Sequence, residues 1–406
     1  MDRRHFLHAS AAGALLAASP LRALAAGQLG PAGLPSGALE SAVLDTLPGR
    51  VPLIKRTWRP PNFETPTAYF NDAFTRNEAF FVRYHLATIP EVDAASWRLT
   101  IGGPAAEKTL ELDLEQLKRG FEQVEVAALC ICSGNRRGLS NPHVPGVQWG
   151  NGAMGNARWK GVRLRDVLNR AGVKADALEV VADGADAAVL DKTPDFVKSI
   201  PVWKALDENT LIAWEMNGEP LPHWNGYPVR LVVPGWTATY WMKHLTSLKV
   251  VNEPYKGFWM ATAYRIPKGK FAIVDRFLTQ ETDTNTPITE MVVSSLVTNL
   301  RDGSVLPGGK PAMVRGVAWD GGFGMQTVEV SLDGGKLWRP ADLGADLGRY
   351  AWRQWSFPIA SPQPGDEYVV MAKATNRIGS SQTFELVFNP AGYHNNVVQP
   401  VRVKFA

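Results

Sequence analysis

The chain contains two cysteines, Cys130 and Cys132, within the stretch ALCICSGNRRGLS at residues 127–139. In an extended strand, residues at this spacing lie about 6.6–7 Å apart on one face, so a strain-free disulfide between them is not expected. The seven histidines show no close ligand spacing of the kind found in zinc sites, and no CxxCH haem-attachment motif is present. Two interpretations remain open: an inert buried thiol, or a single thiolate ligand for a cofactor.

Three arginines could form an anion site near these thiols. Arg136 and Arg137 follow the cysteines directly, and Arg83 lies in the apolar stretch AFFVRYHLATIP at 79–90. Guanidinium groups match tetrahedral oxyanions in geometry and charge. The alternative is that these arginines are ion-pair partners at strand ends on the surface, and spacing alone does not choose between the two.

Strands are the elements expected to position most of these residues. The stretch at 79–90 predicts a strand that carries Arg83 and His85 on one face, since alternate strand residues point the same way. VEVAALCIC at 124–132 predicts a second strand, which ends where SGNRRG must turn. PVRLVVPG at 228–235 predicts a buried strand followed by a turn.

One helix is expected, and the segments around it are too broken for long elements. VRLRDVLNRAGV at 162–173 has apolar residues at helical spacing and ends at Gly172. The Pro/Gly-rich segment at 26–66 is interrupted too often for long helices or central strands.

The last third of the sequence has a different character. The polar stretch TQETDTNTPITE at 279–290 predicts an interdomain linker. Beyond it, AMVRGVAWDGG, MQTVEVSLDGGKLW, YAWRQWSF and DEYVVMAKATN alternate apolar and polar residues between Gly, Asp, Asn and Pro turns. This pattern predicts a β-sandwich of immunoglobulin type, here without an inter-sheet disulfide.

The N-terminal sequence MDRRHFLHASAAGALLAASPLRALAAG predicts a removable export signal. Arg3 and Arg4 precede a short apolar run, and a small-residue ALA ends at Ala25. The run is interrupted by Ser19 and Pro20 and is too short to span a bilayer, so no membrane anchor is expected. The paired arginines are similar to a twin-arginine signal, a route that exports folded proteins. An ordinary secretory signal is the alternative.

Composition bounds the function classes. The 406 residues include 45% hydrophobic and 20% charged residues and 14 tryptophans, which is typical of a soluble globular protein of about two domains. The formal charge of +4 falls to about +2 without residues 1–25, and no Lys/Arg-rich run is present. This balance argues against nucleic-acid binding.

Several motifs in order resemble the sulfite oxidase family of molybdenum enzymes, from about residue 60 to the C-terminus. They are FFVRYHL, CSGNRR, ARWKGVRLRDVL, SIPVWKALDENTLIAWEMNGEPLPHWNGYPVRLVVPGW, YWMKHL, YKGF and VSLDGGKLW. The resemblance implies an α+β fold: a mixed α/β molybdopterin-binding domain followed by an immunoglobulin-like dimerisation domain. The expected organisation is a twin-arginine signal at 1–25, an arm at 26–66, the catalytic domain at 67–280, a linker at 281–290 and the dimerisation domain at 291–406.

The resemblance also implies roles for individual residues around a molybdenum–molybdopterin cofactor. Cys132 matches the thiolate that ligates molybdenum, for which a soft sulfur is suited, and Cys130 is left as a small buried hydrophobe. The substrate-pocket residues are Arg83, Arg137 and Tyr255 of YKGF, with Tyr264 as a second candidate for the tyrosine. The other cofactor contacts are His85, Asp186, Asn225, Arg230 and Lys243.

The chain departs from the animal enzymes in three places. Asn225 stands before GYPVR where those enzymes have a histidine, and His223 lies two residues earlier. The C-terminal WHR segment, which offers another pocket arginine, is replaced by NNVVQPVRV, where Arg402 is a poor substitute in register. A haem domain is not expected before the molybdenum domain.

The activity implied is oxygen-atom transfer that oxidises sulfite to sulfate in the periplasm. Without an internal haem, the two electrons are expected to pass to a c-type cytochrome, and a homodimer or a complex with a cytochrome subunit is expected. The altered C-terminal segment keeps a second reading open, a molybdenum subunit that oxidises protein-bound sulfane sulfur. A methionine-sulfoxide reductase is disfavoured by GNRR and YKGF, and a non-catalytic exported binding protein is the remaining alternative.

Overall fold

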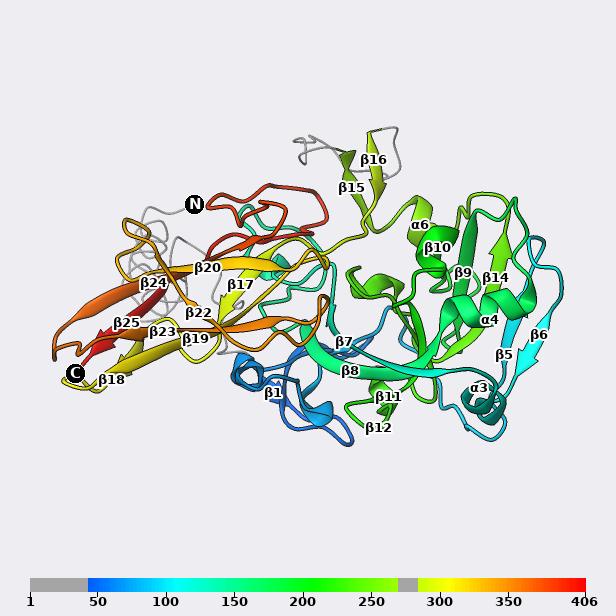
Figure 1. Ribbon diagram of the computed structural model, residues 1–406, viewed down its shortest axis with the longest axis horizontal. Coiled ribbons are helices and arrows are strands. Elements are labelled where there is room, and N and C mark those ends of the chain that lie inside the picture. The colour runs from blue at the N-terminus through cyan, green and yellow to red at the C-terminus, as the bar shows by residue number, and fades with distance from the viewer. Residues whose placement is uncertain (1–42, 269–283) are drawn as a thin grey trace, which may run out of the picture.

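The computed structural model describes residues 43–268 and 284–406. The predicted signal at 1–25 lies outside the described residues, as do parts of the predicted arm and linker. Two lobes lie side by side along the longest axis, one built of strands and helices and the other of strands alone (Figure 1). In the described part of the chain, no helix is long and apolar enough to cross a membrane.

The first lobe contains a mixed five-stranded sheet. In spatial order its strands are β10 (Lys198–Pro201), β9 (Glu179–Gly184), β14 (Leu245–Val251), β5 (Leu99–Gly102) and β6 (Leu110–Leu112). β14 pairs parallel with β5 and antiparallel with β9. Asp186 and Lys243, two of the predicted site residues, lie just outside the ends of β9 and β14.

A second, antiparallel sheet in this lobe carries the cysteines. Its strands are β12 (Glu219–Pro220), β11 (Leu211–Met216), β8 (Met154–Arg163) and β7 (Gln123–Ile131), and β13 (Arg230–Val232) pairs with the first half of β11. β7 confirms the strand predicted at 124–132, and β13 confirms the one predicted at 228–235. Because β7 ends at Ile131, Cys132 is the first residue beyond the strand.

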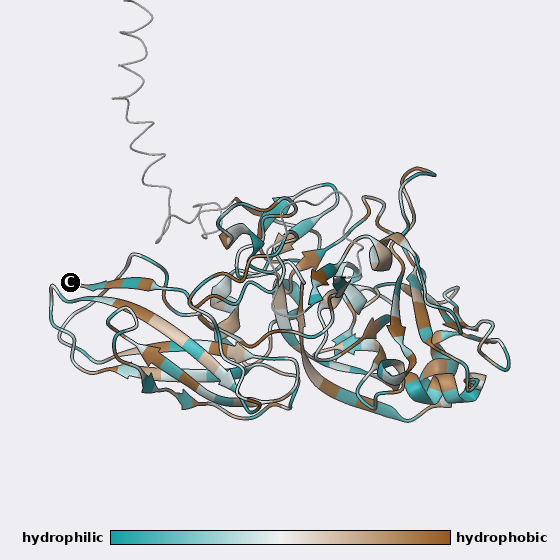
Figure 2. Cartoon of the chain, turned by 90° about the horizontal axis from the view of Figure 1, so that it is seen from above, coloured by the Kyte–Doolittle hydropathy of each residue, from teal (hydrophilic) through white to brown (hydrophobic). Residues whose placement is uncertain are grey.

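The second lobe is a β-sandwich. One sheet has the order β17 (Ser294–Val297), β19 (Ala312–Trp319), β23 (Arg353–Ile359), β22 (Asp342–Leu343); the other has β18 (Ser304–Leu306), β25 (Val401–Phe405), β24 (Glu367–Asn376), β20 (Met325–Ser331), β21 (Arg339–Pro340). Hydrophobic and hydrophilic residues alternate along these strands (Figure 2). The inward residues of both sheets share one core, which includes Val314, Val328 and Trp355. The prediction of a sandwich is confirmed.

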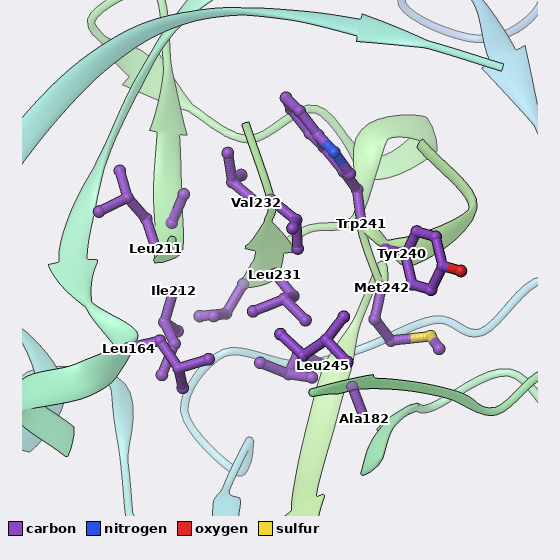
Figure 3. Packing of buried hydrophobic residues seen from close by; sticks show 14 of the residues in the cluster. Leu164, Ala182, Leu211, Ile212, Leu231, Val232, Tyr240, Trp241, Met242 and Leu245 are labelled. Atoms are coloured by element: carbon purple, nitrogen blue, oxygen red, sulfur yellow. The ribbon is translucent and has the colours of Figure 1, made fainter. Parts of the chain in front are cut away.

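The core of the first lobe is apolar on both faces of its central strands. Leu211 and Ile212 of β11 and Leu231 of β13 are fully buried, and they pack beside Trp241 and Leu245 (Figure 3). Strands that are covered on both faces give continuous apolar runs instead of a period of two. This is why LIAW and RLVV in the sequence indicate buried strands.

Helices are few and short in the described residues. α3 (Leu114–Gly120) begins with a capping box, in which the Asp113 carboxylate accepts from the Gln116 N–H at 2.7 Å and the Gln116 side chain accepts in return. α4 (Leu164–Ala171) confirms the predicted helix and ends at Gly172, which has a φ of 76°. α5 (Val202–Ala205) and α6 (Phe258–Ala261) are single turns.

The N-terminal part of the described chain forms a small sheet. Its strands are β1 (Leu44–Asp45), β2 (Leu53–Thr57), β3 (Asn62–Glu64) and β4 (Val82–Arg83). The strand predicted at 79–90 is therefore wrong in length, since only two residues pair with β3 and His85 lies outside it. Phe80 and Phe81 are buried by packing against the first lobe, so their apolar character reflects core contacts and not a long ladder.

Two features join the lobes. β15 (Arg265–Pro267) pairs antiparallel with β16 (Asn285–Pro287), and β16 lies within the described part of the predicted linker. A mixed apolar cluster crosses the boundary, with Phe70 and Leu129 from the first lobe against Trp352 from the second. The Leu129 N–H also donates to the Tyr350 carbonyl at 2.9 Å. The lobes therefore share a packed interface.

Candidate active site

A cavity in the first lobe brings together residues that lie far apart in the sequence. Its walls come from the chain after β4, the end of β7, and the 3-10 turns η6 (His223–Asn225) and η7 (Ala238–Tyr240). The predicted site residues that line it are Arg83, His85, Cys132, Asp186, Asn225, Arg230 and Lys243, and Tyr264 lines it as well. Tyr255 and Arg137 are not among the lining residues.

Both cysteine thiols are free and buried. The Cys132 N–H donates to the Ala153 carbonyl, and the Cys132 carbonyl accepts from the Asn135 N–H, both at 2.9 Å, so hydrogen bonds fix the start of the loop. Cys130 also lines the cavity, and its sulfur accepts a hydrogen bond from Arg230 at 3.9 Å. Burial raises the pKa of Cys130 to about 11, so this residue stays a protonated thiol at neutral pH.

A histidine, a tyrosine and an arginine meet on one wall of the cavity. His85 Nε2 lies 2.5 Å from the Tyr264 hydroxyl, and the Arg83 guanidinium lies 3.5 Å from the same oxygen. The His85 ring stacks on Phe196 at 3.6 Å between centroids. Burial, and then the charges of Arg83 and Lys243, hold the pKa of His85 well below its usual value. His85 is therefore neutral at pH 7, so one of its ring nitrogens donates a hydrogen bond and the other accepts one.

Arg230 is a buried cation held between two indoles. Its guanidinium lies 5.0 Å from the Trp159 ring and 5.6 Å from the Trp241 ring. It donates to the carbonyls of Asn225 at 2.9 Å and Trp241 at 3.2 Å, whereas its Nε has no hydrogen-bond partner among the described residues. A buried N–H of this kind costs free energy unless something else accepts its hydrogen bond.

Lys243 and Asp186 both line the cavity and attract each other electrostatically. Burial lowers the pKa of Lys243 well below its usual value and raises the pKa of Asp186 to about 6, while the attraction between the two opposes both shifts. Lys243 Nζ donates to the Arg83 carbonyl at 2.7 Å and lies over the Tyr84 ring. The cavity therefore combines a buried guanidinium, a buried lysine amine and one carboxyl group with a raised pKa.

Asn225 faces the cavity, but its amide is already bonded to the protein. Its Oδ1 accepts from Arg50, and its Nδ2 donates to the Phe81 carbonyl at 3.2 Å. Arg50 was not expected in the site; it comes from the segment before β2, and proline-rich composition gave no signal for it. The Asn225 amide thus serves mainly to hold the segments of the cavity wall together, rather than to donate a hydrogen bond into the cavity.

Lys198 is a second residue that the sequence did not single out. It is 1% exposed on β10, two residues after Phe196, and its Nζ donates to the Trp259 carbonyl at 2.6 Å. The ammonium group also lies 5.0 Å from the Tyr264 ring. The alternation of strand residues in DFVKSIP is the signal that could have paired Lys198 with Phe196.

The structure places Tyr255 and Arg137 away from the cavity surface. The Tyr255 N–H donates to Glu179 at 3.1 Å, and its half-buried ring packs next to Gly257. Arg137 is buried, and its Nε donates to the Ala391 carbonyl at 2.7 Å. Tyr264, the second candidate, is the tyrosine that reaches the cavity.

Similarity to known proteins agrees with this arrangement. Residues 85–259 match the family described as "Oxidoreductase molybdopterin binding domain", and residues 285–405 match "Mo-co oxidoreductase dimerisation domain". The chain is 37% identical over 332 residues to a sulfite oxidase of Gallus gallus, which covers 78% of this chain and 70% of the relative. The chain belongs to the sulfite oxidase family.

A second sulfite oxidase and a solved structure are also similar to the chain. The mitochondrial sulfite oxidase of Rattus norvegicus is 34% identical over 373 residues, covering 88% of this chain. The chain spans 66% of that relative's length, just under two thirds. The crystal structure of the sulfane dehydrogenase SoxCD from Paracoccus pantotrophus matches with a TM-score of 0.74 and 26% identity, covering 92% of this chain and 91% of that one.

The residues of the cavity fit the molybdenum–molybdopterin cofactor of the family. Arg230 supplies a buried N–H that finds no acceptor in the described part of the chain, and Lys243 supplies a buried amine; both suit the phosphate of a pterin. Cys132 could supply one sulfur ligand, and the described residues contain no cluster of three or more His, Cys, Asp and Glu side chains that could hold a metal ion by themselves. Most of the metal's ligands would then come from the pterin and solvent.

Proposed function

We propose that the protein oxidises sulfite to sulfate at a molybdenum–molybdopterin centre and passes the electrons to a c-type cytochrome. The observation that supports this most is the convergence of Cys132 with Arg83, His85 and Tyr264 in one cavity of a chain that belongs to the sulfite oxidase family. The reaction consumes sulfite and water and yields sulfate, two protons and two electrons.

The bound cofactor would supply the oxygen-atom transfer and accept the two electrons. The chain's own residues have narrower tasks. Cys132 would hold the metal, and Arg230 and Lys243 would hold the pterin phosphate. Arg83 would attract the sulfite dianion and stabilise the charge of sulfate before it leaves.

Neutral His85 and Tyr264 would orient the substrate. The hydrogen bond between the imidazole and the phenol fixes the orientation of both side chains. It therefore also fixes the direction in which their remaining donor and acceptor groups point. Apolar Phe196 covers the other face of His85 and excludes water from that side. Asp186, whose pKa lies near 6, would compensate the charge of Lys243 beside the cofactor.

The test is sulfite-dependent reduction of cytochrome c by purified protein whose molybdenum content has been measured. Reduction at a rate above that of a molybdenum-free sample supports the proposal. If fully loaded protein reduces neither cytochrome c nor ferricyanide with sulfite, the proposed substrate is wrong.

A second candidate is oxidation of protein-bound sulfane sulfur, and two observations favour it. The solved structure of a sulfane dehydrogenase covers nearly the whole chain. In addition, Arg137 lies outside the cavity lining, which leaves Arg83 as the guanidinium on the substrate side. Activity with a persulfidated carrier peptide, in the absence of activity with sulfite, would favour this candidate.

We also propose that the protein works in the periplasm after twin-arginine export. The sequence of residues 1–25 supports this, and a fusion of that segment to a reporter enzyme would test it, with Arg3→Lys and Arg4→Lys as the control that blocks the route. A homodimer or a cytochrome-containing complex is the proposed assembly, since residues 285–405 match a dimerisation domain. Light scattering of the purified protein, alone and with cytochrome c, would measure it.

A further inference from the structure

A segment of the second lobe returns to the candidate active site. Between β24 and β25, residues 389–398 (here called the return segment) leave the sandwich and contact the loop after Cys132. The Asn389 amide clamps a turn by donating to the Tyr393 carbonyl at 2.6 Å and accepting from the Tyr393 N–H at 2.9 Å. Asn395 Nδ2 donates to the Arg136 carbonyl at 3.1 Å. The return segment is therefore tied to the cysteine loop at defined points.

Tyr393 of this segment stacks directly on the tyrosine of the cavity. The rings of Tyr393 and Tyr264 lie 5.6 Å apart between centroids, with an interplanar angle of 10°. Both residues are 6% exposed. Since the Tyr264 hydroxyl meets His85 and Arg83, the ring of Tyr393 fixes the group that closes the substrate side of the cavity.

Arg137 supports Tyr393 from the other direction. Its guanidinium carbon lies 5.3 Å from the Tyr393 ring centroid, and its side chain donates to the carbonyls of Ala391 at 2.7 Å and Val147 at 3.2 Å. Gly392 has a φ of 61°, and a Cβ at that position would lie 2.8 Å from Cγ of Arg137. The return segment thus packs around Arg137 at a distance that only glycine permits.

The backbone of Tyr264 needs such support. Tyr264 has a φ of 60°, in the left-handed region that a bulky side chain rarely adopts. A residue in this conformation persists when the surrounding contacts over-determine it, and such residues gather at functional sites. The stack with Tyr393 and the hydrogen bond from the Ile288 N–H to the Tyr264 carbonyl at 2.8 Å provide these contacts.

We propose that Tyr393 is a positioning residue for the active site: it holds the Tyr264 hydroxyl between His85 and Arg83, and Arg137 acts through Tyr393 instead of contacting the substrate. The sandwich domain then contributes to the chemistry of the other lobe as well as to assembly. The return segment supplies an aromatic ring behind the cavity tyrosine, just before the NNVVQPVRV stretch that replaces the WHR motif.

The first test follows Tyr264 itself and does not depend on the substrate. Protein labelled with 3-fluorotyrosine contains nine tyrosines, and the ¹⁹F resonance of Tyr264 is assigned as the one that Tyr264→Phe removes. Tyr393→Leu and Arg137→Met are expected to shift or broaden this resonance, whereas Tyr393→Phe, which keeps the stacked ring, is expected to leave it in place. Tyr368→Leu, which removes a tyrosine from the sandwich far from the site, is the matched control. An unchanged Tyr264 resonance in Tyr393→Leu would overturn the proposal.

The second test separates positioning from general stability. In variants with wild-type melting temperature and molybdenum content, Tyr393→Leu is expected to lower kcat/KM for sulfite about 10- to 100-fold, since small misplacements in a pocket have effects of this size. In a Tyr264→Phe background the same change is expected to have less than about a 2-fold effect, because the hydroxyl that it positions is gone. Equal losses in both backgrounds would contradict the proposal, and so would additive effects of Arg137→Met and Tyr393→Leu.

Discussion

At the scale of single residues, the end of β7 separates two buried thiols that the sequence places almost together. Cys130 lies inside β7 and opposite Gly155, where burial keeps it protonated and Arg230 uses its sulfur as an acceptor. Cys132 lies just beyond the strand, in a loop that opens on the cavity. Both residues line the cavity, but only Cys132 lies outside the strand, where a single backbone hydrogen bond to Ala153 still holds it.

Cys132→Ser is expected to lower turnover by at least about 100-fold, since a hydroxyl does not ionise at neutral pH as a thiol does and is a poor ligand for a metal held by sulfur. Molybdenum content by mass spectrometry and sulfite-dependent ferricyanide reduction measure the effect. Cys130→Ala is the matched control and is expected to retain most of the activity. Full activity of Cys132→Ser would exclude Cys132 as the ligand.

His394 predicts a pH dependence of stability. Burial lowers its pKa to about 4, well below the ordinary value of 6.5, so the folded protein favours the neutral ring. The stability that this depressed pKa contributes is complete above pH 6.5 and is lost as the pH falls to about 4, a loss of about 3 kcal/mol. His394→Asn keeps a side chain that tolerates the observed φ of 57° and cannot titrate.

Denaturant unfolding of His394→Asn between pH 7 and pH 4 should therefore show a shallower loss of stability than the wild type. His143→Asn, a change at an exposed histidine, is the control and should follow the wild-type curve. Parallel curves for the wild type and His394→Asn would show that His394 is not the group responsible.

At the scale of elements, the close approach of β8 to the cavity wall leaves no room for a side chain at Gly155. A Cβ there would lie 2.5 Å from the ring of Phe80, which is fully buried and lines the cavity. Gly155→Ala is expected to destabilise the protein by about 1–3 kcal/mol and to lower cofactor content, because Phe80 must move. Chemical denaturation and molybdenum analysis measure both effects. The double variant Gly155→Ala/Phe80→Leu should recover much of the loss, and failure to recover would mean that Phe80 is not the obstacle.

Elements with one strong local signal could be predicted from sequence. β7, α4, β13 and the sandwich strands have runs or periods long enough to dictate their state. The segment around Arg83 and His85 could not be predicted correctly, because its aromatic residues are buried by tertiary packing and only two of its residues pair. Both side chains still reach the cavity, so the motif identified the residues and not the element.

The residues of the site also divide into those that the sequence predicts and those that it does not. Residues that belong to contiguous motifs, such as Arg230 and Lys243, were identified by their positions in those motifs. Arg50, Lys198 and Tyr393 were missed because each reaches the site through a contact between segments that are far apart in the sequence. The choice between Tyr255 and Tyr264 also depends on how the chain turns after α6, and no periodicity reports that turn.

At the scale of the whole molecule, the two lobes share apolar packing and an active-site wall. The return segment can hold Tyr393 against Tyr264 only if the sandwich keeps its orientation relative to the first lobe. The cluster that includes Phe70, Leu129 and Trp352 supplies this rigidity from a different part of the interface. Weakening the packing of that cluster should therefore disturb the position of Tyr264 in the catalytic lobe.

Trp352→Ala is the change that tests this coupling. The indole is 1% exposed, lies 5.3 Å from the Phe70 ring and donates from Nε1 to the Ala73 carbonyl at 2.9 Å, so it binds the sandwich to the first lobe through both packing and a hydrogen bond. The loss of a buried tryptophan typically costs about 3–5 kcal/mol. Calorimetry is expected to show a single unfolding transition in the wild type and two transitions in Trp352→Ala. In this variant, the Tyr264 ¹⁹F resonance should already be broadened at temperatures below the first transition. Trp338→Ala, a change at a half-buried tryptophan within the sandwich, should lower stability without splitting the transition. A single transition in Trp352→Ala would mean that the lobes are coupled mainly through the return segment.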